Sequence, residues 1–137
     1  MNNTITKELK DNGVMVLTLK RPEVLNAMNR DLIMGLYETF QELEKEQDSR
    51  VIIITGEGRG FCSGADLANG GWPNEEGMTG GEAGANNMET GFNPLIRLIT
   101  SIDKPVITAI NGIAAGGGVG LALSGDLVVA SESAKFK

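Results

Sequence analysis

Residues 51–56 read Val51-Ile52-Ile53-Ile54-Thr55-Gly56, five β-branched residues followed by a glycine. A continuous apolar run of this length is typical of a strand that is buried on both faces of a parallel sheet. The stretches 105–110 and 127–130 have the same character and predict two further strands. Helical patterns lie between the runs, at about 94–100 and 117–124. Strands that alternate with helices in this way predict an α/β fold.

The N-terminal part predicts a hairpin followed by a helix. Strands are expected at 5–10 and 14–20, because a turn signal, Asp11-Asn12-Gly13, separates them. The following pattern, from about 29 to 47, is helical, and Asn29 is placed to cap it. Its apolar residues recur at spacings of four, four and three: Leu32, Leu36, Phe40 and Leu43.

Composition excludes several classes of protein. The chain has 137 residues, a size typical of one domain, and 12 basic against 18 acidic residues give a net charge of −6. An acidic chain is a poor partner for nucleic acid, and no apolar run approaches the roughly 20 residues that cross a bilayer. The absence of histidine excludes Ser-His and Cys-His catalytic pairs and imidazole metal ligands, so no metal site is expected. The single cysteine, Cys62, fits a reducing compartment, and we expect the cytoplasm.

Glycine is in excess, with 19 residues, and seven of them fall within residues 69–91. This segment has no apolar period, so we expect a long, mobile, glycine-rich loop at about 69–91. Trp72 and Met78 are the large apolar side chains of its first half. They fit either a lid over a ligand or a partly packed loop.

Two further glycine clusters, 56–66 and 111–120, each follow a predicted strand. Ligands of α/β proteins bind beyond the carboxyl ends of strands, so both clusters are candidate sites. Neither has the spacing of a dinucleotide or phosphate-binding loop. The segment from Gly60 to Gly64 has the spacing of a nucleophile elbow with Cys62 at its centre, but it lacks a histidine base. We therefore interpret Cys62 as a small buried residue.

The groups in these clusters that remain available to bind a ligand are those of the main chain. Glycine allows the backbone to approach a ligand closely, and the first amides of a helix are free to bind negative charge. A helix that begins at 116–118 would supply one such amide, and the first glycine cluster, 56–66, could supply a second. Two convergent amides would form an oxyanion hole for an enolate or a tetrahedral anion. The alternative is that both clusters are only tight turns.

The chain resembles the crotonase superfamily, the enoyl-CoA hydratase/isomerase family, over nearly its whole length. The segments that carry the resemblance are 19–27, 53–67, 104–106, 111–112, 115–118, 126–127 and 134–136. The resemblance implies an α/β fold, the β/α spiral of the ClpP/crotonase type, of which residues 1–137 would be the truncated N-terminal part of a single domain. It also implies acyl-CoA thioester substrates and a homotrimer or hexamer in the full-length form.

The same resemblance implies the site residues. It places the oxyanion hole on the backbone amides of Ala65 and Gly117. Its substrate-binding positions match Val24, Leu25, Ala27, Ser63, Asp66, Leu67 and Gly116. It implies no permanently bound cofactor, since coenzyme A enters as part of the substrate. Lys20, Arg21 and Arg59 are candidates to offset the phosphates of coenzyme A, or are plain surface charges.

Two departures from the family pattern bear on the reaction. Gly120 stands where the family's hydratases carry a glutamate, and the chain stops at Lys137, before the segment that carries the second catalytic acid. Asp126 and Glu132 match no catalytic position. We expect an enoyl-CoA isomerase or hydratase/isomerase whose 137-residue chain is itself inactive. The alternatives are an aryl-CoA or acyl-CoA dehalogenase or hydrolase, and a non-catalytic acyl-CoA-binding fragment.

Overall fold

The computed structural model describes residues 3–67 and 76–137. Its main sheet has five strands in the order β1-β2-β3-β5-β7. They are β1 (Ile5–Leu9), β2 (Val14–Leu19), β3 (Val51–Gly56), β5 (Val106–Ile110) and β7 (Leu127–Ala130). β1 and β2 are antiparallel, and every other pair in this sheet is parallel. The predicted hairpin and the three predicted apolar strands are therefore confirmed.

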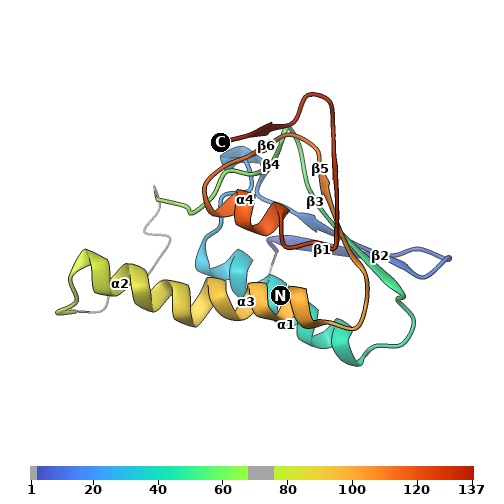
Figure 1. Cartoon of the computed structure of the whole chain (residues 1–137), viewed down its shortest axis with the longest axis horizontal. Helices are drawn as coiled ribbons and strands as arrows, with labels where there is room; N and C mark the ends of the chain where they lie inside the picture. The colour runs from blue at the N-terminus through green and yellow to red at the C-terminus, as the bar shows by residue number, and fades with distance from the viewer. Residues whose placement is uncertain (1–2, 68–75) are drawn as a thin grey trace.

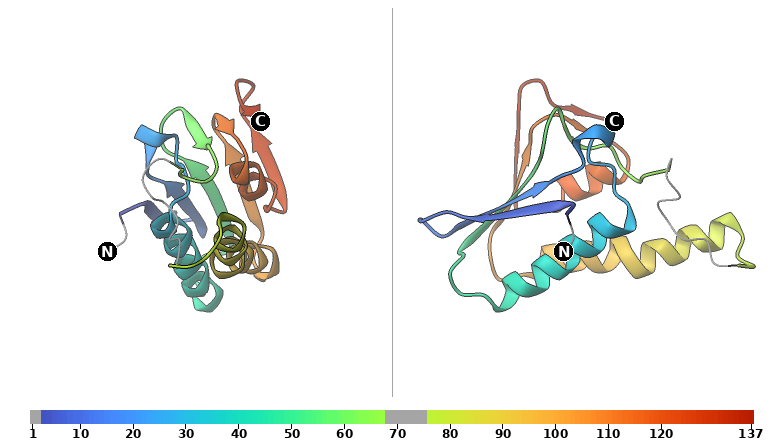
Figure 2. Two further views of the ribbon diagram at one scale, coloured as in Figure 1. Left: turned by 90° about the vertical axis from the view of Figure 1, so that its left-hand side faces the viewer. Right: turned by 180° about the vertical axis from the view of Figure 1, so that it is seen from behind.

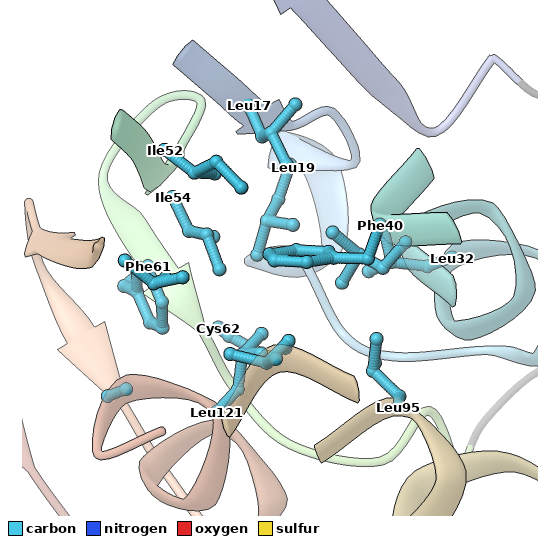
Figure 3. Close-up of a cluster of buried hydrophobic side chains, with 14 of the residues drawn as sticks. Leu17, Leu19, Leu32, Phe40, Ile52, Ile54, Phe61, Cys62, Leu95 and Leu121 are labelled. Atoms are coloured by element: carbon cyan, nitrogen blue, oxygen red, sulfur yellow. The ribbon is translucent and has the colours of Figure 1, made fainter. Parts of the chain in front are cut away.

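Two helices, α1 (Arg30–Lys45) and α3 (Asn93–Ser101), lie side by side against one face of this sheet (Figures 1 and 2). Both were predicted. The Asn29 side chain caps α1 by accepting a hydrogen bond from the Leu32 amide at 2.9 Å. Leu32 and Phe40 of α1 point toward Leu19 and Ile54 of the sheet (Figure 3). Burial of this apolar face is the main force that holds helix and sheet together.

Burial on both faces of the strands was expected, and this expectation is wrong for the described residues. Ile52 and Ile54 are fully buried beneath the helices, whereas Val51 and Ile53 on the opposite face are half-buried. β7 is exposed along its length, with 61% of Leu127 accessible. The reason is that the described helices pack on one face only and that β7 is an edge strand.

A second sheet of three short parallel strands follows the ends of the first. It consists of β4 (Gly60–Cys62), β6 (Ile113–Ala114) and β8 (Lys135–Phe136). The strands come so close that a Cβ on Gly112 would lie 2.0 Å from the Arg59 carbonyl oxygen. Only glycine fits there. A short predicted helix, α4 (Gly117–Ala122), packs against β4, β5 and β6, and a single 3-10 turn, η1 (Pro22–Val24), precedes α1.

The predicted loop at 69–91 is wrong over residues 80–91. The structure has α2 (Gly80–Asn87) and then a π-helical turn, η2 (Met88–Phe92), which runs into α3 as one rod (Figure 1). Thr79 and Glu82 form a capping box in which each side chain binds the other's backbone amide. This cap starts the helix in spite of its glycines. Trp72, with residues 68–75, lies outside the described residues, and Met78 is half-buried. No helix in the described part of the chain is long and apolar enough to cross a membrane.

Candidate active site at two glycine-rich turns

Ala65 lies in an extended segment that forms a parallel bridge with Met28. The Met28 amide donates to the Gly64 carbonyl oxygen at 2.7 Å, and the Asp66 amide donates to the Met28 carbonyl oxygen at 3.0 Å. Successive amides of an extended chain point in opposite directions. The Ala65 amide is therefore directed away from Met28, and it donates no hydrogen bond to any described residue.

Gly117 is the first residue of α4. The chain enters the helix through Gly116, whose φ is +50°, a value that favours glycine. The neighbouring amides are used, because Gly116 donates to the Lys137 carbonyl oxygen and Gly118 to that of Ala115. The Gly117 amide is left without an acceptor among the described residues, as expected in the first turn of a helix.

The two turns pack backbone against backbone. A Cβ on Gly64 would lie 2.8 Å from the Ala115 carbonyl oxygen and 3.4 Å from the Gly117 nitrogen. A Cβ on Gly118 would lie 2.1 Å from the Cys62 carbonyl oxygen. Gly64 also has a φ of +98°. Glycine is thus required at both contact points, and the structure brings Gly117 next to the residue that precedes Ala65.

The loop before α1 completes the surroundings of Ala65. The Ser63 amide donates to the Leu25 carbonyl oxygen at 3.0 Å, and its hydroxyl donates to that of Val24 at 3.1 Å. Val24, Leu25, Ala27, Ser63 and Asp66, all predicted to bind substrate, are therefore gathered around the bridge. The other two predicted residues lie at the margin, Leu67 with 90% of its surface exposed and Gly116 at the entry to α4.

Asn26 is a buried residue that sequence reasoning did not single out. Its side chain is fully buried, and its Nδ2 donates to the carbonyl oxygens of Glu57 and Gly60 at 3.0 and 2.9 Å. Its Oδ1 accepts from the Arg21 amide at 2.8 Å. Asn26 has a φ of +55°, which asparagine tolerates better than most residues. This side chain therefore fixes the loop to the second sheet.

Arg21 and Asp66 form an ion pair inside the site, with Nη2 and Oδ2 2.8 Å apart. The guanidinium also donates to the Ala27 carbonyl oxygen. Arg21 is therefore not a plain surface charge, because its guanidinium contacts Asp66 and Ala27 within the site. Lys20 and Arg59 remain exposed. The Asp66 carboxylate, with 3% of its side chain accessible, positions the Ala65 turn instead of facing solvent.

Cys62 is fully buried, and burial raises the pKa of its thiol to about 11. A neutral buried thiol is a poor nucleophile, so the interpretation of Cys62 as a small core residue is confirmed. Its side chain lies with Phe61 and Leu121 in the core (Figure 3). The part of the chain that the structure describes holds no group of three metal-ligating side chains.

An apolar cavity of about 120 Å³ lies beside Gly117. It is lined by Met28, which precedes α1, and by residues of α1, the π-turn, α3 and α4, among them Met88, Phe92, Leu95 and Gly120. None of the described residues that line it carries an ionisable side chain. A Cβ on Gly120 would meet nothing within 4 Å, so the position of the expected glutamate is open space. The free Gly117 amide thus borders an apolar space.

Comparison with known proteins shows which family the chain belongs to. The profile of the family described as Enoyl-CoA hydratase/isomerase matches residues 9–137. The chain is 43% identical to 1,2-epoxyphenylacetyl-CoA isomerase of Escherichia coli strain K12 over 126 residues, which are 92% of this chain and 47% of that protein. It is 41% identical to a probable enoyl-CoA hydratase of Rhodobacter capsulatus, covering 98% of this chain and 48% of that one.

The solved structures give the same result. The crystal structure of an enoyl-CoA hydratase from Bacillus anthracis superposes with a TM-score of 0.85 at 30% identity, over 98% of this chain and 50% of that one. The chain belongs to the enoyl-CoA hydratase/isomerase family and has the α/β crotonase fold. It spans about half the length of the curated relatives it matches.

Proposed function

We propose that the full-length protein is an acyl-CoA enzyme in which the amides of Ala65 and Gly117 bind the thioester oxygen of the substrate. Removal of a proton next to a thioester, or at a conjugated carbon, leaves negative charge on that oxygen as an enolate. Two preorganised amide donors would lower the energy of this charge. The single observation that carries the proposal is that these two amides, on adjacent turns, lack an acceptor within the described chain.

The favoured reaction is double-bond isomerisation. Addition of water to a double bond needs carboxylates that position and activate the water. Gly120 supplies none, and the other described residues that line the cavity are also without an acid or base. Isomerisation needs one group that takes a proton from one carbon and returns it to another. That group would come from residues outside the described cavity wall.

Further parts of the proposal follow from family membership. Coenzyme A would be bound as part of the substrate and not as a resident cofactor, through Val24, Leu25, Ala27, Ser63, Asp66, Leu67 and Gly116. A homotrimer or hexamer in the cytoplasm is the assembly and location that we propose for the full-length protein. A second candidate, an acyl-CoA-binding protein without catalysis, is favoured by the lack of ionisable side chains around the described cavity.

The test is turnover of paired enoyl-CoA thioesters by the full-length protein. One member of each pair has its double bond conjugated with the thioester and the other has it one carbon further away. We expect interconversion of the pair, with hydration slower by at least about tenfold. Hydration that is faster than isomerisation would contradict the inference from Gly120. Tight binding of both members without any conversion would favour the binding protein.

A further inference from the structure

The cavity beside Gly117 has a size and lining that select among acyl groups. Its volume is about 120 Å³, and an apolar cavity of about 150 Å³ is enough to bind a benzene molecule. The one polar side chain that contributes to its described wall is Asn93, whose Nδ2 donates to Glu89 Oε1 at 2.7 Å. One of its two N–H donors is thus already used, and the other described side chains of the wall are apolar.

The outer wall of the cavity is made by an irregular piece of helix. The π-helical turn Met88–Phe92 begins and ends with residues that line the cavity. Single π-turns are frequent at functional sites, because the widened turn redirects side chains. A Cβ on Gly117 would lie 3.1 Å from Met28 Cε and 3.6 Å from Phe92 Cε1. The Phe92 ring therefore lies close to Gly117, whose amide is proposed to hold the thioester oxygen.

The side chains that form this wall favour binding of a flat ring. Phe92 offers an aromatic surface, and aromatic pairs gain about 0.5–1.5 kcal/mol beyond simple burial. The thioethers of Met28 and Met88 also make favourable contacts with aromatic rings. The missing side chain at Gly120 leaves the floor of the cavity open. An extended acyl chain gains none of these ring contacts.

From these contacts we infer that the acyl group accepted by this protein is a compact apolar ring, and that Phe92, Met88 and Gly120 set this specificity. The inference rests on the proposed function, since it takes Gly117 as the thioester-binding residue. Two of these residues, Met88 and Phe92, belong to the π-turn, so this turn would determine the specificity for the acyl group. The two amides would then bind the thioester oxygen of every substrate equally well, and the cavity would distinguish one acyl group from another.

The test is binding of saturated, unreactive thioesters to the full-length protein by calorimetry. Phenylbutanoyl-CoA and decanoyl-CoA have the same number of carbons and differ in shape. We expect the ring compound to bind at least about tenfold more tightly. Gly120→Leu, which fills the cavity, and Phe92→Ala, which removes its aromatic wall, should each reduce this ratio by about fivefold or more. Leu123→Ala is the matched control, because Leu123 is an exposed residue next to α4 and outside the cavity wall.

The outcomes separate this inference from the proposed function. Equal binding of the two compounds, or a ratio that Gly120→Leu and Phe92→Ala leave as it was, would overturn the inference even if the enzyme isomerises enoyl thioesters. A ring preference that disappears in these variants, in a protein that converts no enoyl thioester, would support the inference and overturn the proposed catalysis. Failure to bind either thioester would overturn both.

Discussion

Arg21 and Asp66 join the loop before α1 to the turn that carries Ala65, with 2.8 Å between Nη2 and Oδ2 and with 13% and 3% of their side chains accessible. The two residues are 45 positions apart in the chain. Because the guanidinium also holds the Ala27 carbonyl oxygen, one cation fixes both strands of the Met28–Ala65 bridge. The position of the Ala65 amide therefore depends on an electrostatic contact that lies outside the hydrophobic core.

Replacing Asp66 by alanine should destabilise the protein by about 3–5 kcal/mol, because it leaves the Arg21 charge buried without its partner. The measurement is the free energy of unfolding in urea. Glu8→Ala is the control, since it removes an exposed ion pair with Lys10 and should cost less than about 1 kcal/mol. An equal loss of unfolding free energy in the two variants would show that the buried ion pair contributes no more to stability than the exposed one.

Ala65→Pro should lower turnover of an enoyl thioester by about 10²–10³, the usual effect of removing one donor from an oxyanion hole. The melting temperature should change little, because the bridge to Met28 uses the amides of residues 28 and 66 and not that of residue 65. Ala65→Gly retains the amide and should keep most of the activity. A proline variant that is as active as its parent would remove Ala65 from the site.

Gly118 and Gly120 lie two residues apart, and substitution by alanine should affect them in opposite ways. Gly118→Ala forces a Cβ to within 2.1 Å of the Cys62 carbonyl oxygen and should cost about 1–3 kcal/mol or more. Gly120→Ala meets open space inside a helix and should stabilise the protein by up to about 1 kcal/mol. Thermal unfolding of both variants measures the difference. Similar melting temperatures would contradict the tight packing of the two turns.

Glu46→Gln should have an effect on stability that depends on pH. A hydrogen bond from the Ser49 hydroxyl, supported by the amides of Ser49 and Asp48 and by Lys104, lowers the pKa of Glu46 from 4.5 to about 2. A carboxylate with a lowered pKa stabilises the folded state above the unfolded pKa, and this contribution is lost as pH falls toward the folded pKa. The deficit of the variant should therefore be full above pH 4.5 and should disappear toward pH 2.

Urea unfolding at several pH values across this range measures the Glu46 effect. Glu44→Gln, at an exposed position in the last turn of α1 two residues before Glu46, serves as the control. A deficit for Glu46→Gln that stays constant from neutral pH to pH 2 would refute the assigned cause.

The sequence was most informative where local pattern and tertiary burial agree. Residues 51–56 form a strand because β-branched side chains suit a pleated, buried surface, and Asn29 caps α1 because its side chain can reach the Leu32 amide. The short strands β4, β6 and β8 carry no such pattern. They are two or three residues long and are held by backbone pairing, and two of them, β4 and β6, lie in glycine-rich segments, which periodicity does not reveal.

The helix α2 and the burial of Arg21 were both missed, but only the helix had a signal in the sequence. The helix α2 was missed because Gly80, Gly81 and Gly84 are poor helix formers, yet the Thr79–Glu82 capping box was present in the sequence as a start signal. The burial of Arg21 had no local signal, since a basic residue beside a proline is usually exposed. Its partner Asp66 becomes a neighbour only when the two loops have folded together.

The two amides of Ala65 and Gly117 differ in one property from the charged side chains that could also bind an anionic oxygen. A peptide N–H neither gains nor loses a proton across the range in which proteins remain folded. Its attraction for an anionic oxygen is therefore the same in mild acid as in mild alkali. Any bell-shaped dependence of turnover on pH would therefore report other groups, such as the one that moves the proton, and not the amide pair.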